Sequence, residues 1–338
     1  MKKDKVKITL AIFLAFVSVL CAGLGTAFAL TYSRYQTYKN KSVTVSAKIN
    51  QMNDDAARIG PTVPVSYIEK YASQTNFLME FLQRIFPDKV VYKGEFGIVY
   101  DDLDPDLQKH KYDYECMQAD AKGIKQYDDG GIKGIKGVDV SYYNTNINWK
   151  KVKADGVSFA IVRAGYRGYV NGAVVKDTSF DSHMSGALAE GIKTGVYFYS
   201  QAVNVKEAVE EAEFVLAAIK NYDVTYPVVF DMEEVTGDNV RTGNLTAEQR
   251  TDIAVAFCER IEQAGFKPMV YGNIKWMIEK LDLSRLEAYD KWFAQYNYTA
   301  PTYPYQYQMW QYTETGDIDG ISGKADINIS FVDYAKQK

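Results

Sequence analysis

The chain has few of the residues on which most metal and nucleophilic sites depend. Only two histidines, His110 and His183, occur among 338 residues, so histidine metal sites and Ser-His or Cys-His catalysis lack their usual material. Of the three cysteines, Cys21 lies in an apolar run and Cys258 on an apolar helix face, where we expect a buried thiol rather than a disulfide. The net charge of -4 gives no basic footprint, which excludes nucleic acid as an expected partner. By elimination, the composition favours a site whose chemistry is carried by carboxylate side chains.

The first 31 residues predict export from the cytoplasm. Four lysines precede an uncharged apolar stretch from Ile8 to Leu30, which is long enough to cross a bilayer that requires about 20 helical residues. We expect a retained single-pass anchor in the cell membrane, with everything after Thr31 extracytoplasmic. Ala27-Phe28-Ala29 also has the form of a signal-peptidase site, so secretion after cleavage stays open.

Residues 32–130 predict an extracytoplasmic stalk or small mixed α+β module. The chain is polar to about residue 60, and apolar residues then recur at helical spacing from Ser66 to Phe86. Two short strands are expected within Lys89–Tyr100, followed by an acidic run, Asp101 to Asp106, that we interpret as a solvated loop. The sequence does not identify a protein partner for this region.

From residue 131 to residue 338, short apolar runs alternate with amphipathic helices, which is typical of βα units and predicts an α/β domain with an irregular TIM-like barrel. Thr246 followed by Gln249 predicts a capping box at the start of one helix. The expected helices are 148–154, 180–190, 205–220 and 247–264. The expected strands are 135–140, 158–164, 195–200, 227–232, 267–271, 291–295, 306–312 and 325–329.

Carboxylates stand at the ends of two of these strands. Asp139 lies near the end of Ile-Lys-Gly-Val-Asp-Val-Ser, and Asp231 and Glu233 end Pro-Val-Val-Phe-Asp-Met-Glu. Side chains alternate along a strand, so Asp231 and Glu233 point the same way with Cα atoms about 7 Å apart. Repulsion and burial at this spacing favour keeping one proton near neutral pH, as a general acid requires. An exposed loop for the pair and a turn for Asp139 are the structural alternatives.

Aromatic content is the second indication of function. The chain has 27 tyrosines and four tryptophans, and the flat faces and polar tips of these side chains suit the binding of sugars. Arg163, at another strand end, could pair with a carboxylate or hold substrate. Packing in the core is the alternative for each aromatic residue. The candidate saccharide-binding aromatics near expected strand ends are Tyr166, Tyr197, Tyr199, Tyr271, Trp292, Tyr296 and Trp310.

An ordered set of motifs resembles glycoside hydrolase family 25, the Chalaropsis-type lysozymes. The set comprises Gly137-Val-Asp-Val-Ser141, Ile147-Asn-Trp149, Phe159-Ala-Ile-Val-Arg-Ala164, Gly195-Val-Tyr-Phe-Tyr199, Asp231-Met-Glu233, Trp292-Phe-Ala-Gln-Tyr296, Trp310-Gln-Tyr-Thr313 and Ala325-Asp-Ile-Asn328. The similarity covers about residues 134 to 331. Asn148 stands where the family commonly has Asp, and Ala325 where Val is usual.

The resemblance implies hydrolysis of the β-1,4 bond between N-acetylmuramic acid and N-acetylglucosamine in peptidoglycan glycan strands. Glu233 would be the general acid and Asp231 would assist it, through the substrate's acetamido group or as nucleophile or base, while Asp139 and Asp326 would complete an acidic cleft. A chitinase relative would have an acidic residue where Val229 stands.

No cofactor and no metal are expected, because the chain has neither a phosphate-binding glycine loop nor a metal-ligand cluster. The competing hypothesis from another class is a non-catalytic, membrane-tethered protein that binds the cell wall or serves as a scaffold.

Overall fold

The computed structural model describes residues 32–33, 35–36, 77–237 and 240–337. The chain divides into two compact units, Met1–Tyr71 and Ala72–Lys338. The expected anchor and the first part of the expected helix Ser66–Phe86 lie outside the described residues. No helix within the described ranges is both long enough and apolar enough to cross a membrane.

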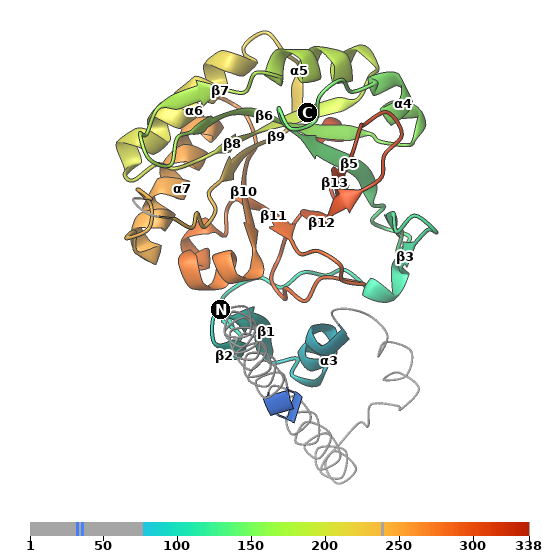
Figure 1. Cartoon of the computed structure of the whole chain (residues 1–338), viewed down its shortest axis with the longest axis vertical. Helices are drawn as coiled ribbons and strands as arrows, with labels where there is room; N and C mark the ends of the chain where they lie inside the picture. Colours follow the sequence, from blue (N-terminus) through green and yellow to red (C-terminus); the bar gives the residue numbers. More distant parts are fainter. Residues whose placement is uncertain (1–31, 34, 37–76, 238–239, 338) are drawn as a thin grey trace, which may run out of the picture. The chain divides into compact units, whose positions relative to one another are not determined.

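An eight-stranded closed sheet forms the centre of the second unit (Figure 1). Its strands are β5 (Ile135–Val140), β6 (Phe159–Arg167), β8 (Lys193–Tyr199), β9 (Val224–Asp231), β10 (Pro268–Asn273), β11 (Asp290–Ala294), β12 (Met309–Gly316) and β13 (Ala325–Ser330). Closure comes from β5, which pairs with β6 on one side and with β13 on the other. A short strand, β7 (Val174–Lys176), extends the sheet from β6.

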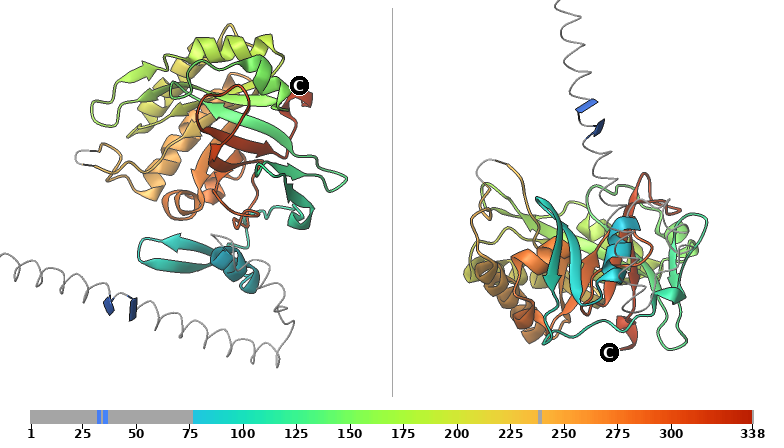
Figure 2. Two further views of the ribbon diagram at one scale, coloured as in Figure 1. Left: turned by 45° about the vertical axis from the view of Figure 1, so that its right-hand side comes forward. Right: turned by 90° about the horizontal axis from the view of Figure 1, so that it is seen from below.

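The eight strands of the closed sheet are parallel from β5 to β12, and of these eight only β13 runs antiparallel to its neighbours; the added strand β7 is antiparallel to β6. Helices follow the early strands and lie outside the ring: α4 (Trp149–Ala154), α5 (Phe180–Ala189), α6 (Val205–Ile219) and α7 (Ala247–Gln263) (Figures 1 and 2). The connection from β10 to β11 contains a π-helical turn (Trp276–Lys280) and a 3-10 turn (Leu283–Leu286), and a short 3-10 turn (Tyr334–Lys336) follows β13. The predicted α/β class is confirmed, and the sheet is a barrel with one reversed strand and few late helices.

Local signals set several boundaries. The capping box predicted at Thr246 and Gln249 is present at the start of α7. Asn148, one of the departures from the family pattern, caps α4 by accepting a hydrogen bond from the Lys151 amide. A side-chain acceptor at a helix start stabilises it by about 1 kcal/mol. Cys258 is fully buried on α7, as expected.

Side-chain alternation divides the apolar residues into two cores. One set packs between the sheet and its covering helices, and the other fills the barrel interior. Gly137 on β5 leaves room for the Phe159 ring, which lies 2.2 Å from where a Cβ atom on Gly137 would stand. The interior set comprises Phe159, Ile161, Tyr226, Val229, Met269, Tyr271, Trp292, Ala294, Met309 and Tyr334.

Residues 77–127 form two small additions. Helix α3 (Phe77–Ile85) packs on the hairpin of β1 (Lys89–Gly94) and β2 (Gly97–Asp102), and a second hairpin joins β3 (Met117–Ala119) to β4 (Lys125–Tyr127). The two-strand prediction for residues 89–100 is confirmed, whereas the second hairpin was not predicted. The interpretation of the acidic run as a loop is wrong at its start, because Asp101 and Asp102 belong to β2.

Candidate active site

The four predicted carboxylates meet at one end of the barrel. Asp139 lies near the end of β5 and is paired in register with Asp326 on β13. Asp231 is the last residue of β9, and Glu233 follows two residues later. Asp139 and Asp231 are buried, at 6% and 4% exposed, whereas Glu233 and Asp326 are half-buried. The site therefore has two buried carboxyl groups and two that remain open to a ligand.

Burial raises the pKa of every member of this cluster, and the negative charge of a nearby carboxylate adds to the rise. Burial raises the pKa of Asp139 to about 6, against the opposing effect of two hydrogen bonds. Burial, followed by the negative charge of Asp139, raises the pKa of Asp326 to about 8. Both effects disfavour the charged form of a carboxyl group. The cluster consequently retains protons near neutral pH.

Asp231 and Glu233 form a coupled pair. Burial, followed by the charge of Glu233, raises the pKa of Asp231 well above its ordinary value. Burial also raises the pKa of Glu233, and a hydrogen bond with Asp231 offsets part of this rise. The protonation state of each of the two groups therefore depends on that of the other.

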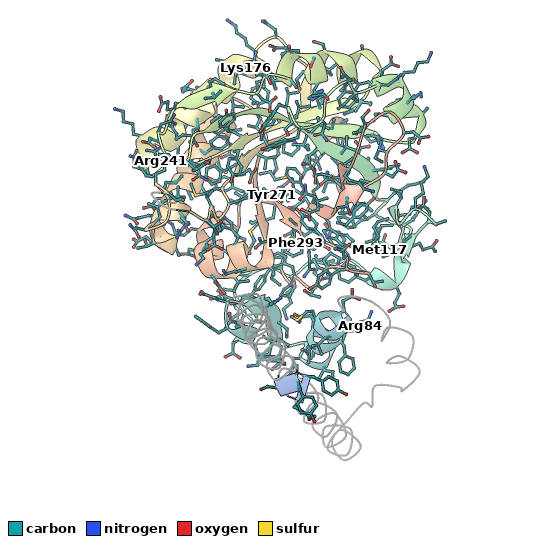
Figure 3. The ribbon with its side chains drawn as sticks, in the orientation of Figure 1. Arg84, Met117, Lys176, Arg241, Tyr271 and Phe293 are labelled. Carbon is teal, nitrogen blue, oxygen red and sulfur yellow. The ribbon has the colours of Figure 1, made fainter. Side chains whose placement is uncertain are left out.

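A polar network fixes Asp139. Its Oδ2 accepts hydrogen bonds from Gln311 Nε2 at 2.8 Å and from Asn328 Nδ2 at 2.7 Å. Trp292 Nε1 donates to Asn328 Oδ1 at 2.8 Å. Gln311 Oε1 in turn accepts from Tyr271, which stands inside the ring of strands in Figure 3. Because each amide is oriented by an aromatic donor, its nitrogen faces the carboxylate.

The predicted sugar-binding aromatics separate into three groups. Tyr166, Tyr197, Tyr199 and Tyr296 are half-buried at the carboxylate end. Tyr271 and Trp292 are buried among the interior side chains, and they support Asp139 through the two amides. Trp310 is not brought to the site, since it packs in the core between the sheet and the outer elements and donates to the Gln295 carbonyl.

Arg163 projects into the same end of the barrel. Its Nε donates to Asp177 Oδ2 at 2.7 Å, and both side chains are buried. Its positive charge opposes the rise in the pKa of Asp231. Within the described part of the chain, Arg163 Nη2 and Asp231 Oδ1 are buried atoms without a hydrogen-bond partner. The ion pair with Asp177 is one of the two roles left open by the sequence.

Sequence reasoning missed three contributors to the site. Gln311 and Asn328 lie within the family motifs but carried no assigned role. Glu314, exposed on β12, raises the pKa of both Glu233 and Asp326 through its negative charge. No strand-end rule selects Glu314, because β12 continues two residues beyond it.

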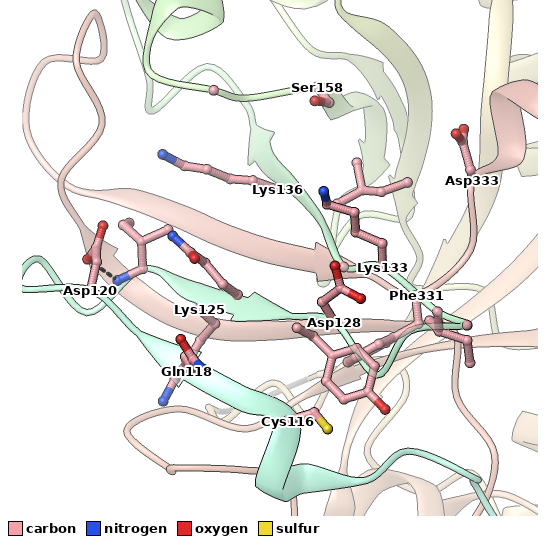
Figure 4. Close-up of a pocket in the computed structure, with 18 of the residues that line it drawn as sticks. Cys116, Gln118, Asp120, Lys125, Asp128, Lys133, Lys136, Ser158, Phe331 and Asp333 are labelled. Atoms are coloured by element: carbon pink, nitrogen blue, oxygen red, sulfur yellow. Dashed lines mark hydrogen bonds between the residues drawn. The ribbon is translucent and has the colours of Figure 1, made fainter.

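A separate cavity of about 980 Å³ opens where β5 begins (Figure 4). Lys133, Lys136 and Asp128 line it together with Ser158, which precedes β6, so it lies at the opposite ends of these strands from Asp139. It contains none of the four carboxylates. Among the described residues, no three His, Cys, Asp or Glu side chains are grouped as metal ligands would be.

Comparison with known proteins agrees with this geometry. The model of the family described as glycosyl hydrolases family 25 matches residues 138–321. The chain belongs to this family. It is therefore a glycoside hydrolase, and its matched segment begins one residue before Asp139 and includes Asp231 and Glu233.

Individual relatives are similar over the same region. Lysozyme M1 of Streptomyces globisporus is 27% identical over 203 residues, which cover 58% of this chain and 67% of that protein. An autolytic lysozyme of Clostridium acetobutylicum is 24% identical over 194 residues, covering 57% of this chain but only 55% of its own length. The crystal structure of a bacterial lysozyme from Streptomyces coelicolor superimposes with a TM-score of 0.50 at 25% identity, covering 61% of this chain and 95% of that one. The similarity thus concerns the barrel.

Proposed function

We propose that the chain is a peptidoglycan N-acetylmuramidase that cleaves the β-1,4 bond between N-acetylmuramic acid and N-acetylglucosamine. The observation that carries the proposal is the proton-retaining cluster of Asp139, Asp231, Glu233 and Asp326 at one end of a family 25 barrel. Two of the similar proteins are named lysozymes, which supports peptidoglycan as the substrate class. A non-catalytic scaffold would have no need of buried carboxyl groups that disfavour their charged forms.

Glu233 is the general acid in this proposal. It is half-buried, so a glycosidic oxygen can reach it, and its raised pKa keeps it protonated more often than an exposed glutamate. Besides burial, the charge of Glu233 raises the pKa of its partner Asp231, so the protonation states of the two groups depend on each other. Glu233 then protonates the leaving oxygen as the bond breaks.

Asp231 assists from the neighbouring position. Besides burial, a hydrogen bond with Asp231 contributes to the pKa of Glu233, so Asp231 stands directly beside the proposed acid. This proximity favours a role for Asp231 in orienting the substrate's own acetamido group over a role as a base acting on water from the opposite face. Arg163 holds a positive charge beside it, and Asp139 and Asp326 complete the cleft lined by carboxyl groups.

The proposal is tested by digestion of peptidoglycan with the full chain and identification of the new reducing ends by mass spectrometry. Wild type should release reducing-end N-acetylmuramic acid, and Glu233→Gln should lower the rate by roughly 10²- to 10⁴-fold, as loss of a general acid does. Glu234→Gln is the matched control, because Glu234 is the exposed neighbour whose partner is Lys275. Reducing-end N-acetylglucosamine would refute the bond, and full activity of Glu233→Gln would refute the acid.

The proposal also places the enzyme outside the cytoplasm, held by residues 1–31. The lysines before the apolar stretch from Ile8 to Leu30 support a cytoplasmic N-terminus and an anchor in the cell membrane. Without protease, the full-length chain should be found in the membrane fraction. Protease added to intact protoplasts should then degrade the barrel. Recovery of full-length chain in the medium or in the cytosol would contradict this placement.

A further inference from the structure

Two tyrosines that the site described above does not use are exposed beside it. Tyr142 and Tyr143 follow β5, on the turn just after Asp139, and are 39% and 73% exposed. Their ring centroids lie 4.0 Å apart with an interplanar angle of 34°. We call this pair the tyrosine ledge. At this separation the two rings overlap face to face, so Tyr142 backs one face of Tyr143, and Tyr143 is the ring of the pair that is mostly open to solvent.

Buried polar groups hold the backbone of the ledge. The Tyr142 amide donates to Asp177 Oδ2 at 3.1 Å, and the Ser141 amide donates to Asn144 Oδ1 at the same distance. The Ser141 carbonyl accepts from the Asn144 amide at 2.9 Å and lies 3.1 Å from His183 Nε2. Because a carbonyl oxygen can only accept, Nε2 of His183 carries the hydrogen between them, and burial lowers the pKa of this ring. These buried partners hold the backbone of the surface turn that carries the two rings.

The ledge is continuous with the carboxylate end of the barrel. The guanidinium carbon of Arg163 lies 4.8 Å from the ring centroid of Tyr142 and 5.6 Å from that of Tyr143. Burial raises the pKa of Tyr199, and the same hydroxyl also feels Glu233, Asp231 and Tyr143. Arg163 and Tyr199 therefore connect the ledge to the proposed acid.

We propose that the tyrosine ledge is a subsite that stacks a sugar ring of the glycan strand at a position away from the scissile bond. This inference rests on the proposed function, since a strand bound at Glu233 must extend along the walls of the cleft. The apolar C–H face of a pyranose suits the negative face of an aromatic ring, and the tyrosine hydroxyls can bond the sugar's own hydroxyl groups. The ledge therefore favours long strands over short fragments.

Binding to defined glycans separates this subsite from the catalytic step. The full chain carrying Glu233→Gln is titrated calorimetrically with an octasaccharide and a disaccharide of alternating N-acetylglucosamine and N-acetylmuramic acid. Adding Tyr143→Ala should weaken octasaccharide binding roughly three- to tenfold, the range expected for one aromatic stacking contact. Disaccharide binding should not change. Tyr143→Phe, which keeps the ring, should retain most of the affinity.

Phe96→Ala is the control for loss of an exposed aromatic ring, because Phe96 is 97% exposed in the turn between β1 and β2. Thermal melting of Tyr143→Ala verifies folding, which an exposed side chain should affect little. The proposed subsite is refuted if Tyr143→Ala leaves the octasaccharide affinity unchanged or lowers the affinity for both ligands equally. It is also refuted if the Glu233→Gln chain with an intact ledge does not bind the octasaccharide. If wild type cleaves a different bond, the proposed function fails while these affinities still report on the ledge.

Discussion

Asp139→Asn should stabilise the protein at neutral pH while impairing the site. Burial raises the pKa of Asp139 from 3.8 to about 6, so the folded chain holds this proton more tightly than the unfolded chain does. The stability that this proton contributes is complete below about pH 4 and is lost as the pH rises through about 6. A shift of this size corresponds to roughly 3 kcal/mol at pH values above 6.

The amide of an asparagine at position 139 carries no charge, and its carbonyl can accept the bonds now donated by Gln311 and Asn328. The cost of ionising a buried group disappears from the folded state. For a domain of about 250 residues, 3 kcal/mol raises the melting temperature by roughly 6–12 °C. This value is an upper limit on the gain, since the carbonyl accepts hydrogen bonds less strongly than a carboxylate does.

Differential scanning calorimetry of wild type and Asp139→Asn at about pH 7.5 and about pH 4.5 measures the effect. The variant should melt higher at the upper pH and nearly with wild type at the lower pH. Asp177→Asn is the matched control, because Asp177 is equally buried but is paired with Arg163, so its neutralisation should lower the melting temperature. A gain at both pH values, or a loss at neutral pH, would refute the electrostatic reasoning.

Three further substitutions test the supports of the site. Asp177→Ala leaves the buried Arg163 without its counter-ion and should cost about 3–5 kcal/mol in urea unfolding. Gly137→Ala places a methyl group 2.2 Å from the Phe159 ring and should cost at least about 1–3 kcal/mol by the same measurement, with partial recovery when Phe159 is shortened to leucine. Asn328→Ala removes one hydrogen bond to the buried aspartate of β5, so a carboxyl-carbon NMR titration should find the pKa of that aspartate raised above about 6 by roughly one unit.

The regular elements of the barrel could be predicted because each carries a local signal. The run 135–140 was predicted with the bounds of β5, and the helices expected at 180–190 and 205–220 agree with α5 and α6 to within one residue. Apolar runs of strand length and helical periodicity are properties of the chain itself. The hairpin of β3 and β4 gives no such signal, because its strands have only three residues each, too few to show a periodic pattern.

The roles of the aromatics depended on information that a single strand does not contain. Trp292 and Trp310 both occur in aromatic motifs, yet one faces the barrel interior and the other faces the outer core. Which side each faces follows from the register of neighbouring strands, including the irregular pairing between Gln311 and Thr313. The two amides that bind Asp139, those of Gln311 and Asn328, come from two different strands, so only the closed sheet brings them together.

Asp326 shows why one member of the cluster could not be found from strand ends. In parallel strands the carboxyl ends meet at one edge, and that rule selects Asp139, Asp231 and Glu233. The last strand is antiparallel, so its beginning lies at that edge, and Asp326 is its second residue. Only the family resemblance selected it. Reversal of the closing strand thus adds a fourth carboxyl group opposite Asp139, and two residues later on the same face it supplies the amide of Asn328 that binds Asp139.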